Sequence, residues 1–466
     1  MLAAYAPKKF YLDTPALPNL LTLVLTHDKN KFQYQNLDDY YRGKHDVLNR
    51  KMEEGKPNNK AVNNFPKLIV DTSTSYFLGE EVTYDVRDKT FSEKLFEVLE
   101  NNNANDVTTE LGKISSIHGH AFEVHWINKE GNHKFKQVSP KNCLMVYSTD
   151  LEEEPVAAII YNSFRDALLN SEVKKVSIFT KDTIYELKHY GETGEYEMLS
   201  SEPHYFGEVP VVEYVSNEER QGDFESVITL IDAYNVTVSD SINDVEYWND
   251  AYLMLTNLNA TTEEDIHQMK QNRVLLVDGD GDAKFITKNV NDKHVENIKD
   301  RLTQDIHKFS QTPNLHDEQF ATNLSGVAIK YKMLGMETKT AIKERKFHTS
   351  LQRRIRLIAT ILNLKGNSFD YKDVRITFTR NLPANLIELA DMAVKLREIV
   401  SDETLREQFP FIHDLELEEE RLEKQQEKAN EQAASNILNA DFSQVFKKEE
   451  NPEETPPQEE PPKGDE

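Results

Sequence analysis

Residues 223–258 read DFESVITLIDAYNVTVSDSINDVEYWNDAYLMLTNL, and this stretch decides the fold of the second half of the chain. Its apolar side chains recur at steps of three and four residues, at Val227, Ile231, Tyr234, Val238, Ile242, Val245, Trp248, Tyr252 and Leu255. This spacing predicts a single helix of up to about 50 Å with one apolar stripe. One helix cannot bury such a stripe alone, so the pattern requires a partner surface.

More helices are expected after this one. Residues 327–364 form a second long helix, with Leu351, Ile355, Ile358 and Leu362 spaced by four, three and four residues. Between the two long helices we expect a short helix at 263–270, a hairpin of 273–277 with 283–287 around the turn DGDGD, a helix at 292–310 and a loop at 312–325. A strand at 374–379 and a helix at 386–400 follow.

The first half of the chain has the alternating pattern of β-strands. Strands are expected at 119–128, 135–138, 144–147, 155–161, 173–180, 183–190 and 196–199, separated by turn sequences such as KEGN, TKD and YGETG. Ahead of them lie predicted helices at 37–50, 67–79 and 91–99 and a strand at 82–86. Consecutive strands joined by tight turns favour antiparallel pairing, so the predicted fold class is α+β and not a nucleotide-binding α/β sheet.

Composition excludes several classes of protein. The chain has 466 residues and a net charge of −26, from 55 Lys and Arg against 81 Asp and Glu, which argues against a protein that coats DNA by neutralising its phosphates. No run approaches the roughly 18–20 apolar residues of a membrane span. The start of the chain lacks the pattern of a signal peptide, so none is expected. The single cysteine, Cys143, allows no intrachain disulfide and indicates a reducing compartment.

The C-terminal stretch 441–466 has the composition of a disordered tail. It holds nine acidic residues, three basic residues and five prolines. Such a segment cannot bury enough apolar area to offset the entropy lost on ordering, so we expect no fixed structure there.

The sequence contains no catalytic motif that we could identify. A P-loop, a nucleophile elbow and an HExxH zinc motif are all missing from it. Asp278, Asp280 and Asp282 alternate as in a calcium loop, but the positions that need Gly and Glu hold Ala283 and Asn289. We therefore interpret this stretch as a solvated hairpin turn.

Three histidines, His118, His120 and His125, lie in or beside a predicted strand. Two imidazoles on one face with no evident third ligand belong more often to a sheet surface than to a metal site. We therefore predict no metal, no cofactor and no enzymatic activity.

The helix at 327–364 is basic in an acidic chain. It carries nine Lys and Arg against Glu337 and Glu344, a local charge of +7. Such a helix could contact phosphates. The alternative, which we favour, is that it neutralises acidic helices of its own chain or of a neighbouring subunit.

Four stretches of the chain match the order of features in a known family. They are KLIVDTSTSYFLGEEVTY at 67–84, FGEVPVVEYVSNEERQGDFESVITLIDAYN at 206–235, TPNLHDEQFATNLSGVAIKYKM at 312–333 and ITFTRNLPAN at 376–385. In this order the chain resembles the portal proteins of tailed double-stranded-DNA bacteriophages, in the branch typical of siphophages of Gram-positive hosts. The likeness spans about residues 65–414.

The resemblance implies a homo-oligomeric ring, usually of twelve subunits, at one vertex of the capsid. Double-stranded DNA would be pumped through its channel by the terminase large subunit and would leave by the same route. Other implied partners are a head-tail connector or adaptor protein and the major capsid and scaffolding proteins, with no membrane involved. The expected location is the virion, after assembly in the host cytoplasm. The missing P-loop agrees with this role, because ATP chemistry would belong to the motor.

The resemblance also implies a portal fold, with an α/β wing, two stem helices, a small clip with a β-hairpin, a tunnel loop, a long wing helix and a helical crown. Carried over by position, these segments are an N-terminal segment at 1–64, the wing at 65–235, the first stem helix at 236–258, the clip at 259–291, the second stem helix at 292–311, the tunnel loop at 312–326, the long wing helix and strand at 327–379, the crown at 380–440 and the disordered acidic tail at 441–466.

Within this frame, cationic and hydrogen-bonding side chains near the second stem helix and on the tunnel loop are expected to face the duplex. They are Lys299, Arg301, His307, Lys308, Asn314, His316 and Gln319. Ion pairs between subunits are the alternative role for the charged ones.

Two other functions compete with the portal hypothesis. The first is a helical scaffold or nucleic-acid adaptor outside the phage virion, which would use the basic helix at 327–364. The second is a metal-dependent hydrolase, which would use the His118 and His120 strand or the turn at 278–282. We rank the hydrolase last, because no acid, base and electrophile can be assembled from the sequence.

Overall fold

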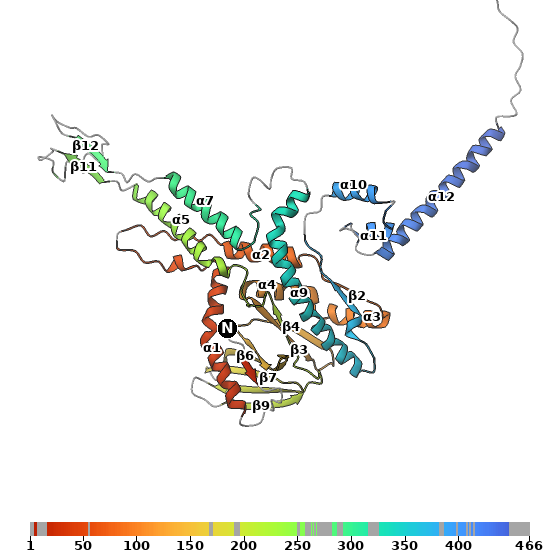
Figure 1. The fold of residues 1–466 in the computed structure, drawn as a ribbon, viewed down its shortest axis with the longest axis horizontal. Coiled ribbons are helices and arrows are strands. Elements are labelled where there is room, and N and C mark those ends of the chain that lie inside the picture. Colours follow the sequence, from red (N-terminus) through yellow and green to blue (C-terminus); the bar gives the residue numbers. More distant parts are fainter. Residues whose placement is uncertain are drawn as a thin grey trace, which may run out of the picture. The chain divides into compact units, whose positions relative to one another are not determined.

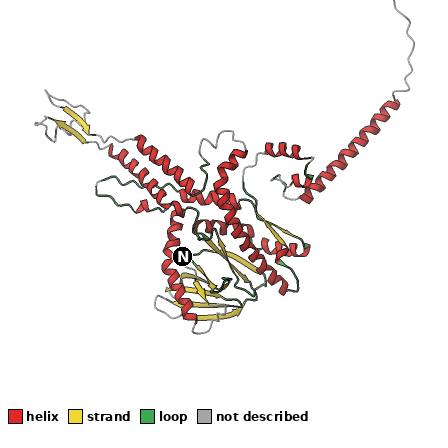
Figure 2. Cartoon of the chain, in the orientation of Figure 1, coloured by secondary structure: helices red, strands yellow, loops and turns green. Residues whose placement is uncertain are grey.

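A computed structural model gives the fold of the chain. The structure describes residues 4–6, 16–54, 56–166, 171–190, 196–248, 252–256, 262, 264, 267, 282–286, 292–315, 326–381, 386–397, 399–406, 409, 412 and 415–446. Residues 1–381 and 382–466 form two compact units, which are described separately (Figures 1 and 2).

The largest sheet in the described part of the chain has six strands in the order β1-β5-β6-β7-β8-β9. Strand β1 is parallel to β5, and the other neighbours are antiparallel. The strands span Ala4–Ala6 (β1), Cys143–Ser148 (β5), Pro155–Asp166 (β6), Ser171–Phe179 (β7), Thr183–Tyr190 (β8) and Tyr196–Pro203 (β9). Helix α1 (Ala16–Tyr41) covers one face, where Leu20 and Val24 pack against the apolar side chains of the central strands (Figure 1).

A three-stranded antiparallel sheet packs against the other face. Its order is β10-β3-β4, with bounds Val211–Val215 (β10), His120–Ile127 (β3) and His133–Val138 (β4). Phe122 and Val211 of this sheet share a core with Met145 and Phe179 of the larger one. Side chains alternate between the two faces along each strand. Each sheet therefore turns one set of apolar side chains towards the other sheet, and the two sheets meet through these residues.

Helices α2 (Phe65–Leu78), α3 (Lys89–Glu100) and α4 (Ala104–His118) form a third layer with the 39-residue helix α9 (Gly326–Leu364). Their core contains Phe77, Leu95 and Leu111 from the short helices and Phe347 and Leu351 from α9. A two-stranded sheet closes this core, because β2 (Thr83–Val86) pairs antiparallel with β13 (Val374–Thr377). Short 3₁₀ turns at Asp46–Asn49, Glu225–Val227 and Tyr371–Asp373 complete the connections.

Helices α5 (Ile228–Trp248) and α7 (Asp292–Phe309) lie side by side in opposite directions (Figure 1). Their bases share a core in which Ile231 of α5 and Ile306 of α7 meet Leu37 and Tyr40 of α1. Beyond them β11 (Tyr252–Thr256) and β12 (Asp282–Ile286) pair antiparallel.

The second unit is helical in its described residues. It contains α10 (Leu386–Leu396), α11 (Asp402–Arg406) and the 32-residue helix α12 (Leu415–Phe446). None of the helices that the structure describes, in either unit, has the length and apolar content needed to cross a bilayer.

The α+β class is confirmed, as are most of the periodic elements. The strands expected between 119 and 199 correspond to β3–β9, and the helices expected at 67–79, 91–99, 292–310 and 327–364 correspond to α2, α3, α7 and α9. The loop expected after α7 is present at 311–315, and its remainder lies outside the described residues.

Several elements were not predicted, among them strand β1 and helix α11. Helix α1 fills much of the N-terminal segment 1–64, where only a short helix at 37–50 was expected, and that helix in fact ends at Tyr41. Its polar residues are interspersed among the apolar ones, so that periodicity gives little signal, and its stability comes from packing on two cores. Helix α4 and strand β10 were also missed.

The prediction of one helix from 223 to 258 is wrong. Helix α5 ends at Trp248, and residues 252–256 form strand β11. The partner of β12 is β11 and not the expected strand at 273–277, which lies outside the described residues. An apolar run of five residues such as YLMLT fits either a helix or a strand, and a partner 30 residues away decides between them.

The predicted start of the unstructured segment, at residue 441, is wrong, and residues 447–466 lie outside the described residues. Helix α12 continues to Phe446, six residues into the segment 441–466 that composition marked as unstructured. The sequence DFSQVF at 441–446 carries three apolar residues, whereas the prolines begin at Pro452. Composition averaged over 26 residues could not separate these two parts.

Candidate functional site

The antiparallel pair α5 and α7 is the part of the structure to which the sequence analysis assigned the channel. Helix α5 carries four acidic residues and no Lys or Arg, and α7 carries four acidic and four basic residues. The pair therefore has eight carboxylates against four cations. Its field is negative on balance, which opposes tight binding of a polyanion.

Three of the predicted channel residues are cations on α7. Lys299 pairs with Glu296 at 2.5 Å, and the exposed Arg301 pairs with Asp305 at 2.9 Å. Lys308 is exposed, and its Nζ lies 5.4 Å from the centre of the Phe309 ring. Each of these side chains reaches solvent, but Lys299 and Arg301 are each paired with a carboxylate of α7 itself.

His307, which was also expected to face the duplex, does not reach solvent in the same way. Its side chain is 9 % exposed, and Nδ1 lies 3.0 Å from the carbonyl oxygen of Thr312. The ring also lies edge-on to Phe65 of α2, 6.1 Å between ring centres. His307 therefore points into the protein, because its place on α7 is on the face that packs on α2. Asn314 is half-buried in the loop that follows, and residues 316 and 319 lie outside the described residues.

The basic residues of α9 neutralise carboxylates of the same chain, as we favoured, but these carboxylates lie on strand β3 and in loops and not on the helices that we expected. Six of the nine form ion pairs with acidic residues of other elements, namely Lys339, Lys343, Lys346, Arg353, Arg354 and Arg356. A cation that is already paired with a carboxylate is a poor ligand for a phosphate. This pairing argues against a nucleic-acid adaptor that uses α9.

The pair of Arg354 with Glu123 of β3 is the most deeply buried of these. Both side chains are fully buried, and Arg354 Nε donates to the two carboxylate oxygens at 3.0 and 3.1 Å. Arg354 Nη1 donates to Thr108 Oγ1 at 2.8 Å, and the guanidinium lies 4.9 Å from the centre of the Phe135 ring. Burial alone would raise the pKa of Glu123, but Arg354 and His125 lower it to about 2.

The three predicted histidines are buried, and none lies on a sheet surface. His118 ends α4 and contacts Asp38 of α1 at 3.0 Å, while His120 lies between Tyr34 and Glu213 at 2.8 and 2.7 Å. Burial excludes the solvated role that we expected, because each ring fills space between layers.

The third histidine, His125, is fully buried beside another histidine. Its Nε2 lies 2.8 Å from Glu123, and its Nδ1 lies 2.9 Å from Nε2 of His133. Among the residues that the structure describes, no group of three or more His, Cys, Asp or Glu side chains is arranged to hold a metal ion. Most residues of the DGDGD turn fall outside that part of the chain.

Residues of α1 that sequence reasoning missed complete this polar layer. His27 Nδ1 lies 2.6 Å from the hydroxyl of Tyr161, and Asp28 pairs with Lys174 at 2.7 Å. Polar residues at steps of three and four along α1 would have been the only sequence signal. That signal does not distinguish a buried polar face from a solvated one.

Because the pKa values of these buried histidines are lowered, we expect acid to destabilise the protein. Burial, with the charge of His120, lowers the pKa of His27 from 6.5 to about 4, and burial also lowers the pKa of His118, His125 and His133. The unfolded chain then binds more protons than the folded one below about pH 6.5. The stability is therefore present above that pH and is lost as the pH falls towards 4.

For His27 alone the loss between pH 7 and pH 5 is on the order of 2 kcal/mol. Thermal unfolding followed by circular dichroism should show a lower midpoint at pH 5 than at pH 7. In His27→Gln the difference between the two midpoints should shrink, whereas in His294→Gln, an exposed control on α7, it should not. Equal midpoints at the two pH values in the unaltered protein would contradict the prediction.

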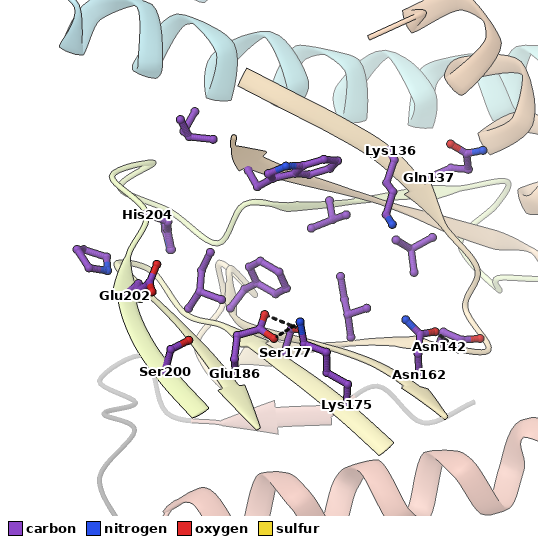
Figure 3. Close-up of a pocket in the computed structure, with 18 of the residues that line it drawn as sticks. Lys136, Gln137, Asn142, Asn162, Lys175, Ser177, Glu186, Ser200, Glu202 and His204 are labelled. Atoms are coloured by element: carbon purple, nitrogen blue, oxygen red, sulfur yellow. Dashed lines mark hydrogen bonds and ion pairs between the residues drawn. The ribbon is translucent and has the colours of Figure 1, made fainter. Parts of the chain in front are cut away.

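A pocket of about 860 Å³ lies between the two sheets (Figure 3). Its polar lining comes from β4, β6, β7, β8 and β9, and Lys175 and Ser177 both contact Glu186, at 2.6 and 2.8 Å. Cys143, which lies in the apolar core beside this pocket, is buried, and burial raises the pKa of its thiol. The Glu186 carboxylate thus binds two side chains of the neighbouring strand β7, the Lys175 ammonium and the Ser177 hydroxyl.

The described fold thus combines long helices with an α+β body in which basic side chains are paired with buried carboxylates. The chain belongs to the family described as phage portal protein, SPP1 Gp6-like, whose family model matches residues 23–432. Its function is therefore that of a portal at the phage capsid, a non-enzymatic component of the virion through which DNA passes.

Two curated relatives carry the name portal protein. One, from Clostridium phage phiCD119, is 26 % identical over 433 residues, which cover 86 % of this chain and 94 % of the relative. The other, from Bacillus phage SPP1, is 24 % identical over 393 residues, which cover 80 % of this chain and 77 % of the relative. These comparisons confirm the resemblance drawn from the four sequence stretches.

Proposed function

We propose that the chain assembles into a ring of twelve copies around a channel for double-stranded DNA. The observation that carries this proposal is a set of uncovered apolar side chains on the long helices. On α9, Tyr331, Leu334 and Ile342 are 75 %, 57 % and 48 % exposed. They lie within an arc of about 80° on the helix surface, since successive residues turn by about 100°. A stripe of this kind is buried when a second copy packs on it.

Helices α5 and α7 support the same assembly. Ile242 and Val245 of α5 and Phe309 of α7 are exposed, although the helices pair with each other. In the ring, α5 and α7 would be the two stem helices that surround the channel, and their excess of carboxylates would keep the duplex from binding to the wall. Low affinity matters there, because each phosphate that is neutralised adds binding free energy and slows the movement of DNA.

The remaining segments take their proposed roles from their places in the chain. The clip would be the region of β11 and β12, which would dock the terminase large subunit and the head-tail connector. The tunnel loop would span residues 312–326, and the sheets with α1–α4 and α9 would form the wing. The crown would be residues 380–440, facing the capsid interior, where capsid and scaffolding proteins are the proposed contacts. Assembly would take place in the host cytoplasm.

Electron microscopy tests the ring. The purified full-length chain, imaged in negative stain at several concentrations, should show annular particles with a central hole, and their rotational symmetry gives the subunit number. Dispersed particles at every concentration, together with a monomer mass by light scattering, would overturn the proposal.

The exposed cations of α7 are proposed to meet the passing duplex. Lys308→Ala should leave ring formation unchanged and should alter the rate or extent of DNA packaging several-fold, because one contact per subunit with the moving duplex is lost. The same change at Lys299, Arg301, Asn314, His316 and Gln319 tests the other candidates. Lys372→Ala, on the 3₁₀ turn before β13, is the matched control. Normal packaging with both Lys308→Ala and His316→Ala would remove these assignments.

A further inference from the structure

The turn after α7 is closed by hydrogen bonds of its own. Gln311 adopts the left-handed backbone conformation (φ 55°), and the amide of Thr312 donates to the carbonyl of His307 at 3.1 Å. The amide of Ser310 donates to the carbonyl of Ile306 at 3.0 Å. The end of α7 therefore has its last carbonyls satisfied locally, and the direction of the chain after Thr312 is set by this turn.

One side chain from α9 binds this turn. The ammonium of Lys339 donates to the carbonyl oxygen of Ser310 at 2.9 Å. A Cβ placed on Gly335, one turn earlier on α9, would lie 3.7 Å from the Cβ of Gln311. Helix α9 is thus in van der Waals reach of the turn, and a cation at the C-terminus of α7 is favourable because the helix dipole is negative there.

The same ammonium reaches the start of α5. Lys339 Nζ lies 3.7 Å from Asp223 Oδ1, five residues before α5 begins. Asp223 is buried, and its other oxygen binds the fully buried Lys343 at 2.9 Å. Lys343 also donates to Ser116 Oγ on α4 at 2.8 Å. The two ends of the α5–α7 hairpin therefore meet at one group of charges on α9.

We propose that Lys339 is a positioning residue that fixes the base of the α5–α7 hairpin, and the exit of the following loop, to α9. It contacts both ends of the hairpin, one through an ion pair and the other through a carbonyl. A displacement of α9 would therefore move both ends of the α5–α7 hairpin together. This proposal rests on the proposed function in one respect, since the loop at 312–325 matters for DNA only if it lies in the channel.

The contacts around Lys339 indicate that its ammonium can be removed without unfolding the protein. Removal of its ammonium leaves Asp223 paired with Lys343, so no buried carboxylate loses all of its partners. Lys339→Met keeps the aliphatic length without the charge, and Lys339→Arg keeps the charge. Lys343→Met, by contrast, leaves a buried carboxylate without its closer partner and should lower stability. Arg345→Met, on an exposed position of α9, is the control for loss of one cation.

Hydrogen exchange of the full-length protein tests the contact itself. Lys339→Met should speed amide exchange at residues 310–312 by about tenfold or more, with α2–α4 unchanged. Lys339→Arg should restore protection and Arg345→Met should not alter it. Unchanged exchange in Lys339→Met, or equal loss in Lys339→Arg, would overturn the proposal.

Packaging by phage supplied with each variant tests the consequence. Lys339→Met rings should form normally and package less DNA, and Lys339→Arg should recover most of the loss. Normal packaging by Lys339→Met with faster exchange would overturn the link to the loop while keeping the contact. If the unaltered protein forms no rings, the proposed function fails, and the exchange experiment still decides the role of Lys339.

Discussion

Arg354→Met is expected to lower the free energy of unfolding of the first unit by about 3–5 kcal/mol. Arg354 is fully buried and binds Glu123, Thr108 and the face of Phe135. Methionine fills much of the same volume but leaves the carboxylate of Glu123 buried without its main partner. The cost of an uncompensated buried charge exceeds that of a lost surface ion pair, which is about 0–1 kcal/mol.

Urea unfolding at a fixed protein concentration measures this effect, with circular dichroism as one probe and tryptophan fluorescence as another. Arg345→Met on the same helix should change the midpoint little. Glu123→Gln combined with Arg354→Met should recover part of the loss, because the amide no longer carries a charge. A midpoint for Arg354→Met equal to that of Arg345→Met would show that the buried pair contributes nothing.

The second large effect is expected on assembly. Leu334→Asp should abolish rings, since Leu334 is 57 % exposed between Tyr331 and Ile342 and the ring would bury all three. Burial of a leucine stabilises the interface by about 2 kcal/mol. Burial of a carboxylate in the same apolar contact destabilises the interface by more than this amount, because the charge loses its hydration. The loss repeats at every interface around the ring, so even a moderate change per contact removes the closed particle.

Negative-stain images and light scattering at matched concentration give the readout. Leu199→Asp, at an apolar position on β9 that is 46 % exposed, is the matched control and should assemble as the unaltered protein does. Circular dichroism of Leu334→Asp should match the unaltered spectrum, because the residue faces solvent in the isolated chain. Abundant rings from Leu334→Asp would exclude this face of α9 from the interface.

Much of the fold could be predicted from the sequence, because its longest elements carry strong periodicity. Helix α9 and the strands β6–β8 bury one face along most of their length, so the spacing of apolar residues marks them. Four short stretches in order also identified the family, without any catalytic motif. Helix α1 was missed because it packs through His27, Tyr34 and Asp38 as well as through apolar residues.

The candidate site was only partly predictable. The cations of α7 were correctly assigned to a helix, but His307 was placed on the wrong face, because an isolated helix does not reveal which side its neighbour covers. The role of Lys339 could not be predicted, since Ser310 and Asp223 are distant from it in sequence. Residues 316 and 319 still carry only the role that the resemblance gave them.

The amino-acid sequence by itself determined the fold class, the acidic balance of α5 and α7 and the portal family. Those properties depend on residue types and their local spacing. Tertiary structure alone decided that β11 pairs with β12, that three histidines are buried and that the cations of α9 are bound to carboxylates of the same chain. Each of these depends on a partner far away in sequence, and no local pattern encodes which partner that is.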